Sequence, residues 1–242
     1  MMQEMEIQEE IKRNISSIKN NINEACKKAG RPENSIRILA ASKAQSTEKI
    51  KIAADLGISL FGENYAKEFL EKYSILGNEI NGKKIEWHFI GHLQRNKVKS
   101  ILPHINVIES LDSFELAEKI NDRSAELNKI TGVFIEVNIS KEDSKYGIDI
   151  GQISEFCGKI SPLSHICVLG FMGMPKFQIS EMNRKHFKQL KEQFDRAKQM
   201  NSKNFNISEI SMGTSNDYKI AVEEGSTIVR LGSLLFGERK YA

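Results

Sequence analysis

A lysine and an arginine, far apart in the chain, each stand at the end of an apolar segment where both could meet one ligand. Lys43 follows the apolar segment 36–41, and Arg230 ends a similar segment near the other end of the chain. A lysine amine can attack an aldehyde carbon, and an arginine supplies a fixed cation. Glycine-containing turns at 213–215 and 232–233 offer backbone N–H groups of the kind that bind phosphate. Together these residue types suit an aldehyde that carries a phosphate group.

Pyridoxal 5′-phosphate (PLP) is the best-known ligand with both groups. Lys43 could bond covalently to its aldehyde after losing a proton, although most loop lysines simply point into water. Arg230 would point inward and could lie against the pyridine nitrogen. An arginine donates hydrogen bonds and accepts none, so it would keep that nitrogen unprotonated, whereas most PLP enzymes that form carbanions place a carboxylate there. Arg230 therefore favours holding PLP over catalysis with it; a surface ion pair is the alternative.

The phosphate of such a ligand has candidate donors in two turns. Glycine lets the backbone approach an anion, and successive N–H groups form a concave anion site. Ser215 and Ser233, the latter directly after Gly232, add hydroxyl donors. A short helix expected over 217–223 would point its N-terminus at the same anion. Two ordinary turns between strands and helices are the alternative interpretation.

Two other groups of residues give weaker signals. His88 and His92 are four positions apart, but they span a strand and a glycine turn with no third ligand at hand, so we expect no metal site. We assign no catalytic residue. The charged run 141–145 is typical of a solvated loop. Its alternative interpretation is a mobile flap whose Lys145 meets PLP in transit.

The composition argues against several kinds of partner. The 242 residues are 40% hydrophobic, enough for a sizeable core, and carry a formal net charge of only +3 with both signs spread along the chain. This argues against a nucleic-acid surface or a polybasic membrane tail. No apolar run approaches the roughly 20 residues of a membrane helix, and the first ten residues lack a signal-peptide core. The three cysteines are widely spaced, which predicts free thiols. We therefore expect a cytoplasmic protein with no nucleic-acid or membrane partner.

The apolar pattern predicts alternating helices and strands. Isoleucines at helical spacing predict an N-terminal helix over 6–29. Eight expected strands follow, at 36–41, 58–61, 85–90, 107–108, 133–137, 166–169, 207–210 and 227–229. The expected helices between them are 47–56, 66–73, 94–101, 113–127, 150–159, 184–200 and 218–223.

This alternation predicts a parallel α/β sheet, most economically a closed (β/α)8 TIM-like barrel with an extra N-terminal helix. A doubly wound open sheet is the alternative. Because no linker or internal repeat interrupts the pattern, we expect a single domain over 1–242. In a barrel, chemistry sits where strands end and loops begin, and the candidate residues fall at such places.

Several motifs occur together and in a fixed order along the chain. They are Ala41-Ser42-Lys43, Phe61-Gly62-Glu63-Asn64-Tyr65, Trp87-His88-Phe89-Ile90-Gly91-His92-Leu93-Gln94, Glu136-Val137-Asn138-Ile139-Ser140, Ser144-Lys145-Tyr146-Gly147-Ile148, Ser211-Met212-Gly213-Thr214-Ser215-Asn216-Asp217 and Gly225-Ser226-Thr227-Ile228-Val229-Arg230-Leu231-Gly232 with Phe236-Gly237. Across essentially the whole chain they resemble the pyridoxal phosphate homeostasis proteins, the PLP-binding protein family of bacteria and eukaryotes. Departures such as Arg95 for the more usual serine and Thr214 for methionine do not touch Lys43.

The resemblance implies a barrel like the N-terminal domain of alanine racemase and of bacterial-type ornithine decarboxylases. Lys43 would form the internal aldimine (a Schiff base) with PLP, and Arg230 would lie against the pyridine nitrogen. Ser215 and the backbone of the turn at 232–233 would hold the phosphate. The cofactor-binding residues that it implies are Lys43, Asn64, Ser215, Arg230, Gly232 and Ser233.

The same resemblance suggests the function. The family is implicated in buffering and delivering PLP, without robust turnover, so we expect a monomeric PLP homeostasis protein whose partners are PLP and apo PLP-dependent enzymes. A PLP-dependent amino-acid racemase or decarboxylase is the alternative. It is disfavoured because the chain stops at Ala242, soon after Gly237, before a second domain that could supply an acid/base. A class I aldolase-like barrel is a further alternative, although aldolase lysines usually lie on later strands.

Overall fold

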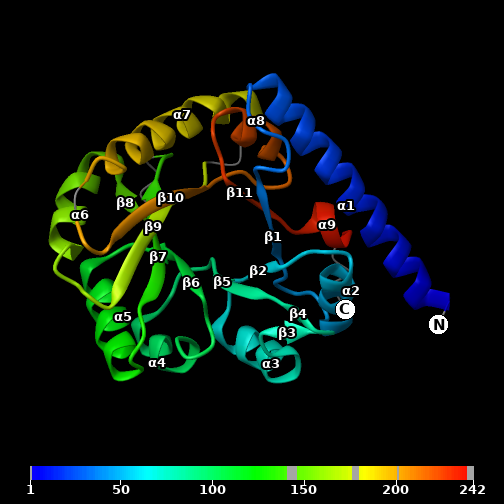
Figure 1. The fold of residues 1–242 in the computed structure, drawn as a ribbon, viewed down its shortest axis with the longest axis horizontal. Coiled ribbons are helices and arrows are strands. Elements are labelled where there is room, and N and C mark those ends of the chain that lie inside the picture. Colours follow the sequence, from blue (N-terminus) through cyan, green and yellow to red (C-terminus); the bar gives the residue numbers. More distant parts are fainter. Residues whose placement is uncertain (1, 141–145, 176–179, 201, 239–242) are drawn as a thin grey trace.

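The computed structural model describes residues 2–140, 146–175, 180–200 and 202–238. Parallel strands lie side by side in a ring, and helices cover its outside (Figure 1). The order around the ring is β6-β5-β2-β1-β11-β10-β9-β7, and the pairing of β6 with β7 closes it. The predicted (β/α)8 barrel is therefore confirmed, and the open-sheet alternative is wrong.

Each strand of the ring contains or overlaps one predicted strand. The ring consists of β1 (Arg37–Ala41), β2 (Leu60–Glu63), β5 (Glu86–Phe89), β6 (Val107–Leu111), β7 (Thr131–Asn138), β9 (Ile166–Gly173), β10 (Phe205–Ser211) and β11 (Ile228–Leu231). In the described part of the chain, three short strands lie outside the ring: β8 (Ile148–Asp149) pairs with β7, and β3 (Glu79–Ile80) forms an antiparallel hairpin with β4 (Lys83–Lys84).

The helices also follow the predicted pattern. They are α1 (Met2–Lys28), α2 (Thr47–Asp55), α3 (Ala66–Leu76), α4 (Val98–Ile101) after the 3-10 turn Arg95–Lys97, α5 (Phe114–Glu126), α6 (Ile153–Ile160) after the 3-10 turn Ile150–Gln152, α7 (Ser180–Ala197), α8 (Tyr218–Glu223) and α9 (Ser233–Phe236). The sequence analysis did not predict α9, whose four residues are too few to show a helical period.

The N-terminal helix α1 packs on the outside of the barrel beside α8 and α9 (Figure 1). Its isoleucine stripe explains this placement, because Ile11, Ile15, Ile18 and Ile22 are all buried. Near one end of the interface, Asn14 Nδ2 donates to the Leu235 carbonyl at 3.1 Å. The first and last helices of the described chain are thus held against each other.

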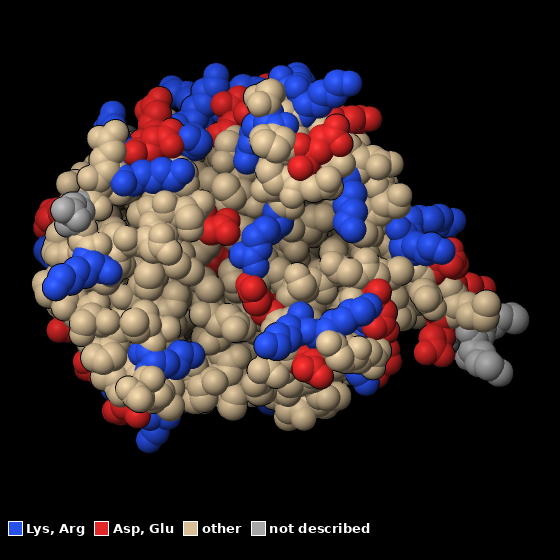
Figure 2. Space-filling view, in the orientation of Figure 1, with Lys and Arg blue, Asp and Glu red and all other residues tan. Residues whose placement is uncertain are grey.

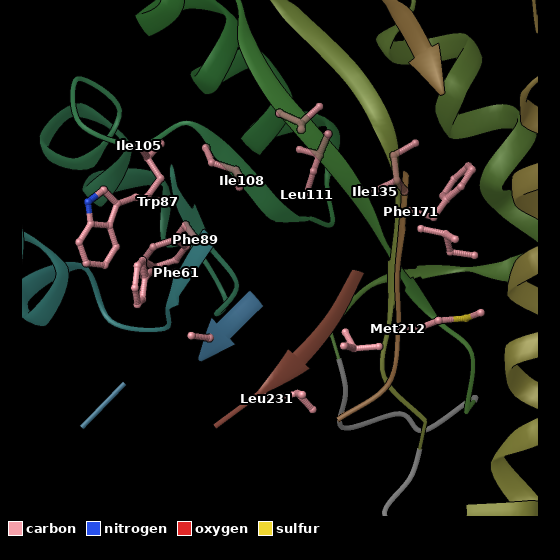
Figure 3. Close-up of a cluster of buried hydrophobic side chains, with 14 of the residues drawn as sticks. Phe61, Trp87, Phe89, Ile105, Ile108, Leu111, Ile135, Phe171, Met212 and Leu231 are labelled. Atoms are coloured by element: carbon pink, nitrogen blue, oxygen red, sulfur yellow. The ribbon is translucent and has the colours of Figure 1, made fainter. Parts of the chain in front are cut away.

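Alternate residues of each strand face two different cores. Outward-facing residues such as Phe61 and Trp87, whose rings are 5.6 Å apart, pack between strands and helices (Figure 3). A smaller apolar cluster fills the barrel interior; its members are Leu39, Leu60, Val107, Phe134, Met172 and Ile228. Because the strands are parallel, all their carboxyl ends emerge at one end of this packed barrel.

Charged side chains of both signs are interspersed over the face seen in Figure 2, without an extended patch of one sign. Within the described residues, no helix combines the length and apolar character needed to cross a bilayer. This face therefore offers no obvious electrostatic footprint for nucleic acid.

Candidate functional site

Four adjacent strands carry the residues predicted to bind PLP. In the ring these strands are neighbours in the order β2-β1-β11-β10. Lys43 follows β1, Asn64 follows β2 and Ser215 lies in the loop after β10. Arg230 lies within β11 in register with Leu39, and a Cβ added to Gly232 would stand 3.4 Å from the Ala41 carbonyl oxygen. The barrel therefore gathers the predicted residues at the carboxyl ends of neighbouring strands.

Arg230 is a buried cation, with 6% of its surface exposed, so the surface ion-pair alternative is wrong. Its Nη1 donates to the Ser211 carbonyl at 2.8 Å and to Ser211 Oγ at 2.7 Å, and its Nη2 donates to the Gly173 carbonyl at 3.1 Å. Burial lowers the pKa of the guanidinium, while the nearby carboxylates, led by Glu109, oppose this change. A guanidinium nevertheless remains protonated in proteins. The site thus contains a fixed, donor-only cation.

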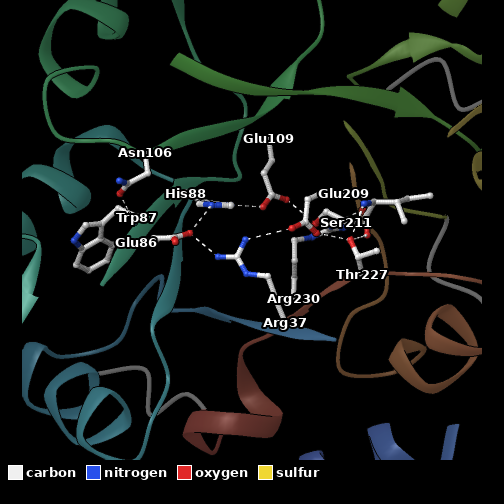
Figure 4. Close-up of polar contacts among 11 residues, drawn as sticks. Arg37, Glu86, Trp87, His88, Asn106, Glu109, Glu209, Ser211, Thr227 and Arg230 are labelled. Carbon is white, nitrogen blue, oxygen red and sulfur yellow. Dashed lines mark hydrogen bonds and ion pairs between the residues drawn. The ribbon is translucent and has the colours of Figure 1, made fainter. Parts of the chain in front are cut away.

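A chain of polar side chains runs through the barrel interior to Arg230 (Figure 4). His88 Nδ1 lies 2.6 Å from Glu109 Oε1, and Ser211 Oγ donates to Glu109 Oε2 at 2.6 Å. Ser211 Oγ in turn accepts from Arg230. The side chains of His88 and Glu109 are 1% and 0% exposed. Glu109 therefore stands between two cationic groups and neutralises charge deep in the barrel.

The protonation of this pair follows from its contacts. Burial alone would lower the pKa of His88, but the hydrogen bond to Glu109 and the interaction with Glu86 outweigh it and raise the pKa. Burial alone would raise the pKa of Glu109, but His88 and Arg230 hold it below its ordinary value. Both shifts favour the form of the pair in which His88 is protonated and Glu109 is ionised.

The other end of the polar chain lies toward the amino ends of the strands. Arg37 Nη2 donates to Glu86 Oε2 at 2.5 Å, and Arg37 Nη1 lies 3.5 Å from Glu209 Oε1 (Figure 4). The interaction with His88, together with Arg37, lowers the pKa of Glu86 to about 2 despite partial burial. The sequence analysis missed this chain. A signal was present, because Glu109 interrupts an otherwise apolar strand and a charged residue there needs a buried partner.

The loop after β10 adopts the tight turn expected of a phosphate site. Gly213 has a φ of +93°, and a Cβ there would stand 2.5 Å from the Ala221 Cβ, so glycine is required. Asp217 accepts from the Thr214 N–H at 2.7 Å and from Asn183 Nδ2 at 2.8 Å, which fixes the turn. Ser215 lies half-buried within the turn. Its hydroxyl therefore sits on a braced loop.

The three other loops of the site, after β1, β2 and β11, differ in exposure. Lys43 and Asn64 are half-buried, whereas Ser233, the first residue of α9, is exposed. Asn64 Oδ1 is buried and accepts no hydrogen bond from the described residues. A buried amide oxygen without a donor is costly, and a bound ligand or water with a donor group would satisfy it. Asn64 thus offers an acceptor at the mouth of the barrel.

His88 and His92, whose spacing raised the question of a metal site, lie in different surroundings. His88 is enclosed in the barrel with Glu109, as described above. His92 lies at the rim, 35% exposed, with Nδ1 3.1 Å from Asp112 Oδ2 and its ring stacked 3.7 Å from the ring of Tyr146. The described residues contain no cluster of three or more metal-ligating side chains. The charged run 141–145, with Lys145, lies outside the described residues.

Glu136 near the carboxyl end of β7 is an acidic group whose pKa lies well above its ordinary value. Burial and the neighbouring Asp112 raise its pKa to about 7, and the charge of Arg230 opposes them in part. Between its ordinary pKa of 4.5 and about 7, the folded protein holds this proton and the unfolded chain does not. The stability contribution of Glu136 is therefore full below about pH 4.5 and is lost as the pH rises to about 7.

Replacing Glu136 by glutamine should remove that loss. At pH 8 we expect Glu136→Gln to exceed the unmodified protein in free energy of unfolding by about 3 kcal/mol, since one pKa unit corresponds to about 1.36 kcal/mol. At pH 4.5 the two should be alike. Urea unfolding of cofactor-free protein at both pH values measures this, with the exposed Glu118→Gln as control. An equal effect of Glu136→Gln at both pH values would contradict the assignment.

Comparison with known proteins supports the resemblance found in the motifs. Residues 14–240 match the model of the alanine racemase N-terminal domain. The chain is 40% identical over 228 residues to a pyridoxal phosphate homeostasis protein of Aquifex aeolicus, covering 94% of this chain and 97% of the relative. It is 34% identical over 242 residues to the pyridoxal phosphate homeostasis protein of Escherichia coli K12, covering 96% of this chain and 98% of the relative.

Solved structures agree with this result. PipY of Synechococcus elongatus, solved with PLP bound, superposes with a TM-score of 0.79 at 27% identity, covering 94% of this chain and 100% of that chain. Alanine racemase of Clostridium difficile has a TM-score of 0.68 at 17% identity, covering 95% of this chain and 56% of that chain, which shows a shared fold. The motifs, the closed barrel and the near-complete coverage agree: the chain belongs to the pyridoxal phosphate homeostasis protein family, which is built on the alanine racemase N-terminal barrel.

Proposed function

We propose that this protein binds PLP and serves its homeostasis, holding the cofactor and releasing it to apo PLP-dependent enzymes. The curated relatives named above and the PLP-bound PipY structure support this proposal. The observation that carries it is the buried Arg230, whose strand is paired with the strand that precedes Lys43. Within the proposal, the chain acts as one domain over 1–242, as a monomer in the cytoplasm.

The residues present fit PLP. Lys43 would hold the aldehyde carbon covalently, and Arg230 would face the pyridine nitrogen. The Ser215 hydroxyl and the N–H groups of the turn at 232–233 would bind the phosphate, since such turns suit anions. The unsatisfied Asn64 oxygen would accept a hydrogen bond at the same end of the barrel.

These residues favour storage over turnover. PLP supplies an electrophilic aldehyde and an electron-accepting ring when it is bound. Ser211, which bonds Glu109, also bonds Arg230 and holds it in place as a cation. Arg230 can only donate hydrogen bonds, so it would not stabilise a protonated ring nitrogen as a carboxylate would. The ring would therefore remain a weak electron sink, while Lys43 and the phosphate turns still bind.

PLP-loaded protein should transfer its cofactor without transforming amino acids. We expect it to reactivate an apo-transaminase, and we expect negligible racemisation or decarboxylation of alanine, serine and other amino acids after long incubation. Chiral chromatography and the reactivation assay measure the two outcomes, with free PLP at the same concentration as the control. Turnover of roughly 1 s⁻¹ or more, within the ordinary enzyme range, would establish the racemase or decarboxylase alternative instead.

A further inference from the structure

A buried ion cluster lies directly beside the segment that carries Lys43. It consists of Glu63 at the end of β2 and of Glu68 and Lys72 on α3, and we call it the α3 ion cluster. Lys72 Nζ lies 2.8 Å from Glu63 Oε1 and 2.7 Å from Glu68 Oε1. The side chains of Glu63, Lys72 and Glu68 are 0%, 8% and 26% exposed. The sequence analysis assigned none of them a role.

The α3 ion cluster holds the backbone on both sides of Lys43. On the preceding side, Lys72 Nζ donates to the Ser42 carbonyl at 2.6 Å, and Ser42 Oγ donates to Glu63 Oε1 at 2.6 Å. On the following side, the Ala44 N–H donates to Glu68 Oε1 at 2.5 Å. The peptide group before Lys43 Cα is therefore anchored to Lys72 and the one after it to Glu68, and these two side chains are paired with each other.

The conformation of this segment requires such an anchor. Ala44 has a φ of +57°, in the left-handed region that residues with a Cβ rarely adopt. A residue stays there only when its surroundings determine it, and such outliers concentrate at functional sites. The charge-assisted hydrogen bonds to Lys72 and Glu68 hold the backbone in this conformation. No residue of the cluster is itself one of the proposed cofactor ligands, so its effect would act through Lys43.

We propose that the α3 ion cluster positions Lys43. It fixes the backbone on both sides of this residue, and so the direction in which the lysine side chain extends toward the cofactor aldehyde. The proposal rests on the proposed function. Glu63, Glu68 and Lys72 are then positioning residues, separate from the groups that bind the ring and the phosphate. A misplaced amine loses much of the advantage of a pre-oriented reaction, in which about 1 Å of displacement can cost about a hundredfold.

The test compares two ligands on variants of Glu68, whose partial exposure favours a folded product. Pyridoxamine 5′-phosphate has the ring and phosphate of PLP but an amine in place of the aldehyde, so it cannot condense with Lys43. We expect Glu68→Ala to weaken PLP binding and to slow borohydride trapping at Lys43, each by about tenfold or more. Binding of pyridoxamine 5′-phosphate should change by less than about twofold.

Two further variants separate positioning from general loss of structure. Glu68→Gln keeps an oxygen for the Ala44 N–H and should restore most of the trapping rate. Glu71→Ala removes an exposed carboxylate one turn away on the same helix and should match the unmodified protein. Equal loss of both ligands in Glu68→Ala, or no loss of either, would overturn the positioning role. Absence of trapping in the unmodified protein would instead refute the proposed function, and this inference with it.

Discussion

Replacement of Lys43 by alanine should abolish covalent attachment of PLP. The unmodified protein is expected to show the visible absorbance of a lysine–PLP Schiff base and to retain the cofactor through denaturation after borohydride reduction. Lys43→Ala should lose both signals, because no other group would stand at the aldehyde position of the proposed site. Some noncovalent affinity should remain through Arg230 and the phosphate turns. Absorbance spectra and a peptide map of the reduced protein measure the result.

A matched lysine provides the control for this experiment. Lys51 is exposed on α2, close in sequence to Lys43, and Lys51→Ala should leave the spectrum and the map unchanged. Undiminished labelling at another lysine in Lys43→Ala, Lys145 included, would show that Lys43 is not the principal attachment site.

Replacement of His88 by leucine should be strongly destabilising. It leaves the Glu109 carboxylate fully buried after removing its closest cationic partner. Breaking a buried pair by removing one member typically costs about 3–5 kcal/mol. Combining His88→Leu with Glu109→Gln should recover a large part of that loss, since a neutral amide is easier to bury than a carboxylate. Urea unfolding of the single and double variants near neutral pH measures the effect.

A histidine–carboxylate pair at the rim of the barrel gives an internal control. The His92 side chain is 35% exposed and that of its partner Asp112 is 10% exposed, and contact with water weakens an ion pair and lowers the cost of losing one partner. His92→Leu should therefore cost far less than His88→Leu. If the two costs were equal, or if the double variant at positions 88 and 109 were no more stable than His88→Leu, buried charge would not explain the effect.

Local patterns were sufficient to predict the barrel. Apolar strands and amphipathic helices alternate with distinct periods, so their order identified the ring. The boundaries were less accurate where polar residues enter a strand. The predicted strand 107–108 extends to Leu111, because Glu109 and Ser110 are buried inside the barrel rather than in a loop. The hairpin of β3 and β4 was missed because its strands are two residues each and largely charged.

The candidate site likewise has a part that local sequence predicts and a part that it does not. The places of Lys43 and Arg230 at strand ends follow from the local sequence and the rule that barrel chemistry lies there. The side chains that contact these residues cannot be predicted from the local sequence. The contact between Glu109 and Ser211 depends on the placement of two strands far apart in sequence. The contact between Lys72 and Ser42 depends on how α3 packs against β2, the neighbour of β1 in the ring. Such long-range contacts leave no periodic signal in one sequence.

The position of β11 in the ring has a consequence for the order in which the molecule is assembled. β11 lies between β1 and β10, and the helix after it contacts α1, where Asn14 and Leu235 are 221 positions apart. During synthesis the segment with Lys43 emerges well before Arg230 and the turn at 232–233. Contacts over such separations also form late, because long loops must close first. The proposed cofactor site would therefore be complete only once β11 has joined the ring, and a ligand that needs both Lys43 and Arg230 would bind only molecules in which this has happened, which shifts the folding equilibrium toward them.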